Sequence, residues 1–371
     1  MPGARLDDGQ IAEAIVQFNP GEMSDDEKAW RAEIQRVTGF TIPEHRQVEL
    51  KDTRYWGDPQ TPYIYCRFTI TDRDTSAERL DVEDLVKAVK AVRRKAAPKA
   101  AGTGRALIVA WADLQFGKAG SRGDSEDLVN RVLSKLDALD GYAKETCCDS
   151  AYLVDVGDCV ESFENVPSQA FTNDLSFPEQ LRLARRMFTE AAMRLARSHA
   201  QVTCVGVPSN HGRWRKGKDQ LGRPGDDYGI ETLVAVSDAF ALNPDAFGHV
   251  QFVVPDVWEE TVALDVNGTI LAVTHGHQVG RPEQIPNWWA QQVHGGQPAA
   301  DADILLTGHF HSVRVQPSGR SAHTGRAKWF IQAPTLDNGS DWYRLKYGAD
   351  SDPALMVFTV DANGWDNLRL L

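Results

Sequence analysis

The sequence predicts a layered α/β domain over residues 106–371, preceded by a small α+β accessory domain over residues 1–95. Along residues 106–371, short apolar segments alternate with segments of amphipathic helical spacing, a pattern typical of sheets buried between helices. Residues 93–105, RRKAAPKAAGTGR, combine small residues, a proline and glycines with scattered cations, and show no apolar periodicity. We therefore interpret residues 96–105 as a linker between the two domains.

Composition and charge narrow the class of protein. A chain of 371 residues, 42% hydrophobic and 25% charged, is long enough for two globular domains with sizeable cores. No apolar run approaches the ~20 residues that span a bilayer, and the N-terminal MPGARLDDGQ lacks the apolar segment of a signal peptide. The 5 cysteines lack C-x-x-C spacing and fit reduced thiols, so we expect a cytoplasmic protein without membrane contact. The net charge of −12 argues against coating of nucleic acid by bulk attraction, but it allows local binding of phosphates.

The accessory domain carries structural patterns only. Residues 25–37 have helical spacing of apolar side chains behind Ser24, a candidate N-cap. Residues 61–72 alternate like a strand, and residues 81–95 form a second amphipathic helical pattern. Because no cluster of metal-ligating or nucleophilic residue types occurs here, we assign this domain no chemistry. We expect it to bind a protein partner or a second copy of the chain.

In the larger domain, five apolar segments are predicted strands: residues 106–115, 150–159, 201–211, 269–277 and 302–311. Helical spacing lies between them in residues 125–144, 178–199 and 227–241. Each predicted strand ends in polar residues, and ligands of open α/β sheets gather at the carboxyl ends of strands. These polar residues are Asp113 and Gln115, Asp158, Asn210 and His211, His275 and His277, and His309 and His311. Carboxylate, amide and imidazole groups without thiolate suit a divalent ion such as manganese, iron, zinc or magnesium rather than a structural zinc site.

The same residues carry a family resemblance. Five segments of the chain resemble, in order, the five motifs of calcineurin-like metallophosphoesterases. They are D-x-Q (113–115), GDCVES (157–162), SNHGR (209–213), THGH (274–277) and GHFH (308–311). The resemblance runs from about residue 108 to residue 311 and leaves the accessory domain uncovered. It implies a four-layer αββα sandwich with two divalent metal ions ~3.5–4 Å apart, which together clamp a phosphoryl group.

Carried over motif by motif, the resemblance implies a role for each residue. The first ion would be held by Asp113, Gln115, Asp158 and His311. The second would be held by Asp158, which would bridge the two ions, and by Asn210, His275 and His309. A hydroxide between the ions would attack phosphorus, and His211 would act near the leaving oxygen as a general acid or as a stabiliser of the transition state. Manganese is the favoured ion, with magnesium, iron, zinc and nickel as alternatives.

The chain departs from the family's pattern in its first and third motifs. Gln115 stands where histidine is usual, and its amide oxygen is a weaker ligand that would loosen the first metal site and favour harder ions. Ser209 stands where glycine is usual. Gly212 replaces the usual acidic residue, which removes one partner that could orient His211. The remaining ligands are all present, so we expect a metal-dependent activity.

Segments beside the motifs leave alternatives open. GRWRKGKDQLGR (212–223) is either a solvated loop or a basic rim that binds substrate through Arg213, Trp214 and Arg215. His277 either lines the site or satisfies a backbone group. Trp288 and Trp289 either form a wall of the cleft or pack in the core. DNGSDWYRLKYG (337–348) is a predicted surface or interface loop to which we assign no role.

We expect a metal-dependent phosphodiesterase or nuclease that acts on DNA, RNA or nucleotides. Within the family the chain looks closest to the nuclease-like branch, similar to phage-encoded homologues and to the nuclease subunit of the bacterial SbcCD complex. If the chain is phage-encoded, its place of action is the host cytoplasm. Two alternatives are a phosphomonoesterase that acts on protein or a small molecule, and a catalytically silent binding module, which Gln115 favours.

Overall fold

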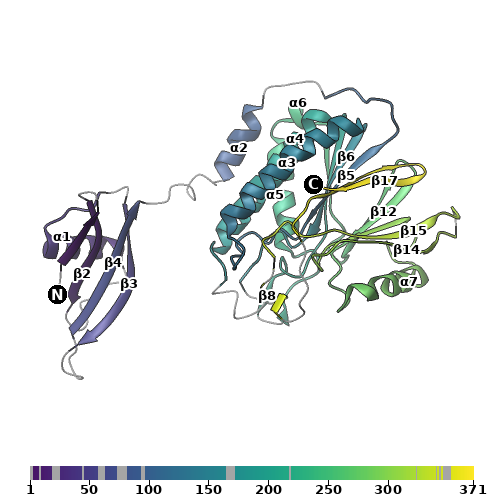
Figure 1. Ribbon diagram of the computed structural model, residues 1–371. Coiled ribbons are helices and arrows are strands. Elements are labelled where there is room, and N and C mark those ends of the chain that lie inside the picture. Colours follow the sequence, from purple (N-terminus) through teal and green to yellow (C-terminus); the bar gives the residue numbers. More distant parts are fainter. Residues whose placement is uncertain are drawn as a thin grey trace. The chain divides into compact units, whose positions relative to one another are not determined.

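The structure divides into two units. It is a computed structural model that describes residues 3–7, 10–18, 26–43, 46–56, 63–72, 82–92, 97–163, 172–216, 219–322, 324–339, 341, 344–345 and 352–371. Contacts between residues separate the units Met1–Arg79 and Leu80–Leu371. Both contain helices and strands (Figure 1), so the mixed α/β class that the sequence predicts is confirmed.

The first unit is an antiparallel sheet packed against helix α1 (Glu27–Thr38). Its strands, in the order β1-β2-β4-β3, are β1 (Gly3–Asp7), β2 (Gln10–Phe18), β4 (Tyr63–Asp72) and β3 (Arg46–Trp56). The helix buries Ile34 in one apolar cluster with Phe68 of the sheet. It begins at Asp26, whose carboxylate accepts the backbone N–H of Lys28 at 3.1 Å. The expected N-cap, Ser24, lies outside the described residues.

The second unit contains, in its described part, two larger sheets. The first has the order β10-β7-β6-β5-β16-β17, with β5 (Ala106–Ala112), β6 (Ser150–Gly157), β7 (Gln201–Gly206), β10 (Val250–Val253), β16 (Met356–Asp361) and β17 (Gly364–Leu370). The second has the order β11-β12-β13-β15-β14, with β11 (Thr261–Val266), β12 (Thr269–Thr274), β13 (Ile304–Thr307), β14 (Arg314–Arg320) and β15 (Ala327–Gln332). Strands β5, β6, β7 and β10 are mutually parallel, as are β12, β13 and β15. Strand β8 (Arg215–Lys216) pairs with β9 (Asp219–Gln220) in a short antiparallel sheet.

Helices pack against both sheets (Figure 1). The first sheet carries α3 (Ser125–Thr146), α4 (Phe177–Ser198), α5 (Tyr228–Ala241) and α6 (Pro244–Phe247). The second carries α7 (Ile285–Gly295), which η3 (Pro282–Gln284) precedes. Apolar clusters fill the interfaces. Leu153 of β6 shares one cluster with Phe188 of α4, whereas the next residue, Val154, shares another with Leu306 of the second sheet. Successive strand residues point to opposite faces, which explains why these strands are apolar throughout.

Helix α2 (Val82–Ala91) belongs to the second unit. Val89 is fully buried in the cluster that joins the helices to the first sheet. The Asn243 side-chain amide donates to the carbonyl oxygens of Val89 and Val92 at 3.0 and 3.2 Å. The linker-like composition that follows this helix favours grouping residues 81–95 with the accessory domain. In the structure, the contacts of α2 group it with the second unit.

Among the helices that the structure describes, none is both long and apolar enough to span a bilayer.

The polar residues of interest lie just beyond the strand ends. The predicted strands of the larger domain correspond to β5, β6, β7, β12 and β13, but the structure ends each one earlier than predicted. For example, β5 ends at Ala112 and β13 at Thr307, so Asp113 and His309 lie in loops. Carboxyl ends of parallel strands share an edge of a sheet, and here loops from both sheets come together.

The two sheets are joined at this edge by a buried histidine. His275, directly after β12, donates its Nδ1–H to the carbonyl oxygen of Val156 in β6 at 2.8 Å. Gly157 follows with a φ of 104°. A Cβ at Gly157 would lie 2.6 Å from the Ser209 Cβ and 2.7 Å from the His275 Nδ1, so only glycine allows this approach.

Gly157→Ala should therefore destabilise the second unit and displace His275. The left-handed backbone alone costs about 1–2 kcal/mol, and the overlap adds about 1–3 kcal/mol. Thermal unfolding measured by circular dichroism should show the loss. The matched control is Gly268→Ala, because Gly268 has a φ of 87° but nothing closer than 3.8 Å to its added Cβ. Equal melting temperatures for the two variants would contradict the steric account.

Candidate metal centre

The site residues adopt a backbone conformation that is rare outside glycine. Positive φ angles between 45° and 67° occur at Asp113, Gln115, Asp158, His309 and His311. Each such residue costs about 1–3 kcal/mol, so surrounding contacts must hold it. The backbone N–H of His309 lies 3.0 and 3.1 Å from the two carboxylate oxygens of Asp113, and that of His211 donates to Asp158 at 2.8 Å. The carboxylates thus help to fix the loops that surround them.

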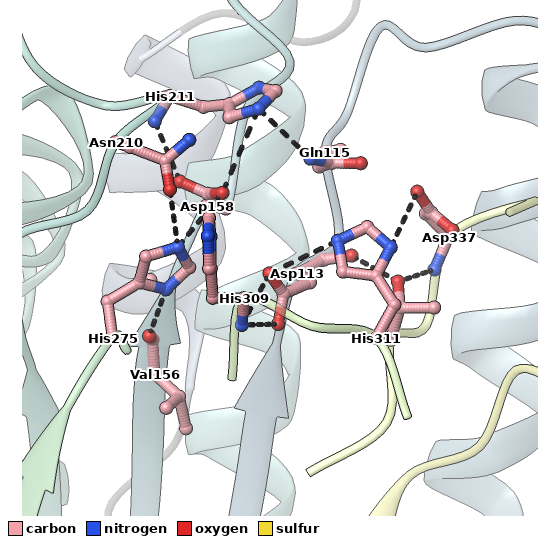
Figure 2. A network of polar contacts seen from close by, with 12 residues as sticks. Asp113, Gln115, Val156, Asp158, Asn210, His211, His275, His309, His311 and Asp337 are labelled. Atoms are coloured by element: carbon pink, nitrogen blue, oxygen red, sulfur yellow. Dashed lines mark hydrogen bonds and ion pairs between the residues drawn. The ribbon is translucent and has the colours of Figure 1, made fainter. Parts of the chain in front are cut away.

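One half of the site gathers three metal-ligating side chains. Asp158, His275 and His309 each place one ligand atom within 4.8 Å of the others. Asp158 Oδ2 lies 3.0 Å from His275 Nε2, and Asn210 Oδ1 lies 2.9 Å from the same nitrogen (Figure 2). These residues follow β6, β7, β12 and β13, so both sheets contribute. We refer to these four residues as the Asp158 cluster.

The tautomer of His275 indicates which kind of ligand the Asp158 cluster can bind. Because Nδ1 donates to the Val156 carbonyl, the neutral ring carries its lone pair on Nε2. That nitrogen faces oxygen atoms of Asp158 and Asn210, which are acceptors as well. Three electron-pair donors that converge need a cation between them, which is either a proton on Nε2 or a metal ion that replaces this proton. A backbone carbonyl that fixes the tautomer of a histidine is the usual support of a metal ligand.

The pKa values of Asp158, His275 and His309 also depend on how closely these side chains approach one another. Burial would raise the pKa of Asp158, but His275 and the other histidines around it hold that pKa well below its usual range. Burial would lower the pKa of His275, yet Asp158 raises it to about 9, so without an ion the ring carries a proton on Nε2 that a metal ion would displace. Burial and the charge of His275 together lower the pKa of His309 to about 3, which leaves its ring neutral and able to bind an ion. The donors of the Asp158 cluster therefore fit a divalent metal ion.

The other half of the site is arranged around Asp113 and His311. Asp113 is fully buried, and its Oδ1 lies 3.4 Å from His311 Nε2. The other ring nitrogen of His311 lies 3.9 Å from Asp337 Oδ2 (Figure 2). That carboxylate oxygen accepts from Lys118 Nζ at 2.5 Å, within a nearly buried ion pair. Burial opposes the charge of Lys118, but Asp337 and further carboxylates raise its pKa, so the amine is an ammonium.

Gln115 is held by two neighbours. Its Oε1 accepts from Lys118 Nζ at 2.7 Å, and its Nε2 lies 3.4 Å from His211 Nε2. Lys118 has only donors, so it fixes the amide with the oxygen toward itself and the NH₂ group toward His211. Figure 2 shows the amide nitrogen pointing at the imidazole. The oxygen that was expected to bind the first ion is thus engaged by an ammonium group.

His211 has an orienting partner that the third motif does not supply. Its Nδ1 lies 2.9 Å from the Glu161 carbonyl oxygen and 3.3 Å from Glu161 Oε2. Burial would lower the pKa of His211, but Asp158 and Glu161 raise it to about 9. A Cβ at Gly212 would lie 2.6 Å from Asp227 Oδ2, so Asp227 already fills the space beside this glycine. Glu161 holds the ring so that Nε2 faces the site.

The residues expected at the rim have different positions. Arg213 is buried and makes an ion pair with Glu260, so it does not form an exposed basic rim. Trp214 is 54% exposed, and Arg215 is half-buried. The ring centroid of His277 lies 5.5 Å from that of His275, so His277 lies beside the Asp158 cluster. Burial and the charge of His275 lower the pKa of His277 to about 2.

Trp289 belongs to the core. It is buried, and its indole N–H donates to the Ala299 carbonyl at 2.8 Å. Trp288 packs against the same apolar cluster. Of the two alternatives for this pair, the packing contacts favour core packing over a wall of the cleft.

Three residues near the site are not indicated by the motifs. Asp337 lies in a segment whose sequence predicts a surface loop without a role, but its side chain is only 1% exposed. Glu161 lies within the second motif, three positions after Asp158, and its place in that motif was an available signal. Lys118 follows the first motif by three positions, but nothing local indicates its partner Asp337, which is 219 residues away.

Comparisons with known proteins give weak matches. No family model matches the chain, and no curated protein matches it. The chain is similar to a conserved uncharacterized protein from Streptococcus pneumoniae, described as a predicted phosphoesterase, with 13% identity, 70% of this chain and 86% of that chain covered, and a TM-score of 0.26. The purple acid phosphatase of yellow lupin (Lupinus luteus) seeds matches with 12% identity, 95% and 68% coverage and a TM-score of 0.32. The phosphopantetheinyl hydrolase of Mycobacterium tuberculosis matches with 12% identity, 66% and 93% coverage and a TM-score of 0.24. At these TM-scores the matches carry no argument about this chain.

Asp158→Asn should weaken the binding of a divalent ion at the Asp158 cluster. Loss of an outer-shell partner typically costs about 10–100-fold in affinity, so loss of a direct carboxylate ligand should cost at least about 100-fold. Titration of the EDTA-treated protein with Mn²⁺ by calorimetry measures this. His294→Ala is the control, because His294 is an exposed histidine on α7. Unchanged affinity in Asp158→Asn would rule out this cluster as the site.

Proposed function

We propose that this chain is a metal-dependent phosphoesterase of the calcineurin-like type, with the four-layer αββα sandwich of that family. The observation that carries the proposal is the Asp158 cluster, with His211 directly beside it. Asp158, Asn210, His275 and His309 would hold a divalent ion. When bound, the ion supplies positive charge that stabilises a phosphoryl group during its transfer. Manganese is the ion we favour.

The roles of the protein's own residues follow from their contacts. His211 is held at Nδ1 by Glu161, which leaves Nε2 directed toward the site. A proton at Nε2 can pass to the leaving oxygen of the ester, so we assign His211 as the general acid. Asp158 holds the backbone of His211 through its N–H at 2.8 Å, so the same carboxylate positions both the ion and the acid.

We further propose that the substrate is a phosphodiester of DNA, RNA or a nucleotide. Trp214 and Trp258 are 54% and 68% exposed, and the two loops that carry them are linked by a backbone hydrogen bond from Gly225 to Val257. The guanidinium carbon of Arg223 lies 6.0 Å from the centre of the Trp258 ring. Exposed aromatic rings beside an arginine suit stacked bases and phosphates. With a net charge of −12, binding of nucleic acid must be local to such a surface.

The proposed activity is tested on a panel of esters. With millimolar Mn²⁺, the protein should hydrolyse bis-p-nitrophenyl phosphate and single-stranded DNA faster than p-nitrophenyl phosphate, and EDTA should abolish all three activities. His211→Ala should lower kcat by about 10²–10⁴ without loss of bound manganese. A preference for p-nitrophenyl phosphate would show a phosphomonoesterase instead. Metal binding without hydrolysis of any ester would indicate a catalytically silent module.

Trp214→Ala tests the nucleic-acid surface separately. Loss of one stacking platform should cost about 1–3 kcal/mol, or roughly a tenfold rise in KM for single-stranded DNA. The KM for bis-p-nitrophenyl phosphate should stay unchanged, because that ester is too small to reach a rim. The control is Val293→Ala, an exposed apolar residue on α7. Equal effects on both substrates would count against a stacking role.

A further inference from the structure

The two halves of the site differ in how their negative charge is balanced. In the Asp158 cluster, Asp158 Oδ2 and Asn210 Oδ1 both approach His275 Nε2, and no lysine or arginine is bonded to Asp158 in the described part of the chain. Around Asp113, the chain supplies its own cation. Lys118 Nζ lies 2.5 Å from Asp337 Oδ2 and 2.7 Å from Gln115 Oε1, with the side chain only 15% exposed.

The orientation of Gln115 determines whether a second metal ion can bind near Asp113. A metal ion would need the amide oxygen, but that oxygen is turned toward the ammonium group of Lys118. The NH₂ group, which has no lone pair to offer an ion, faces His211. A divalent ion bound to this oxygen would also lie close to the positive charge of Lys118 and would be repelled by it. The ligands near Asp113 therefore do not fit a second divalent ion as the resemblance implies.

We propose that the Lys118 ammonium takes the place of a second divalent ion, so that the chain binds one ion tightly at the Asp158 cluster. Gln115 then contacts Lys118 through its oxygen and lies beside His211, and it is not a metal ligand. Asp337 holds the ammonium in place, and Asp113 remains bound to the His309 backbone and close to the His311 ring. This inference rests on the proposed function, because it assumes that the Asp158 cluster binds metal.

The experiment counts bound ions. The full chain, freed of metal with EDTA, is titrated with Mn²⁺, and bound manganese is measured by equilibrium dialysis and by electron paramagnetic resonance. We expect one tight ion per chain, with the spectrum of an isolated ion. In Lys118→Met the repulsion is gone, and the double variant Gln115→His/Lys118→Met adds a ligand. The second ion should bind at least about tenfold more tightly in the double variant than in wild type.

The control variants show whether the charge of Lys118, at its own position, limits binding of a second ion. Lys144→Met removes an exposed lysine near the end of α3 and should leave the stoichiometry at one. Gln115→His alone should not gain a second ion, because Lys118 is still present. If the Lys118 variants lose their circular dichroism spectrum, the wild-type resonance spectrum decides the matter without them.

The outcomes distinguish this inference from the proposed function. Two tight ions in the wild-type chain, with the spectrum of an exchange-coupled pair, would overturn the role of Lys118 but leave a metal-dependent phosphoesterase intact. A second ion that binds equally well with and without Lys118 would overturn it too. Failure of the wild-type chain to bind any manganese would overturn both proposals. One ion in wild type and two in the double variant would support the inference.

Discussion

The constraint on which the site depends is the burial of carboxylates where the two sheets meet. Asp113 and Asp158 are almost completely buried, and an isolated buried carboxylate is costly unless cations or donors compensate it. Each carboxylate is compensated by groups from elsewhere in the chain. Backbone N–H groups reach both, and His275 reaches Asp158 from the other sheet. The same charge that binds the loops together at Asp158 would also attract a divalent metal ion.

Strained loops make this arrangement specific. The turns after β5, β6 and β13 hold residues other than glycine in left-handed conformations, which persist only because several contacts determine them at once. Gly157 is the point where this crowding leaves no space for a side chain. Such rigidity matters for chemistry, because ligands that are already in place lose little freedom when an ion binds. The fold thus prepares the site before any ligand arrives.

Much of the fold and part of the site could be predicted from the sequence, and the limits have physical causes. Apolar alternation and helical spacing are local signals, so they predict the main strands and helices of the larger domain. The residues of the Asp158 cluster follow these strands, and the structure brings them together. Burial of a charged side chain is not a local signal. Arg213 reads as a basic rim residue in a cationic segment, but Glu260, far along the chain, pairs with it and draws it inward. Helix α2 likewise precedes a segment of linker-like composition, but its contacts group it with the second unit.

By itself, the sequence determined which residues stand at the ends of the apolar strands and in what order. That followed because strand periodicity and the types of metal-ligating side chain are properties of short segments. Only the tertiary structure decided how those residues are used. It turned the Gln115 oxygen toward Lys118, brought Asp337 to the same ammonium from 219 residues away, and placed Glu161 behind His211. Electrostatic partners of this kind meet only after the chain has folded, so no short segment encodes them.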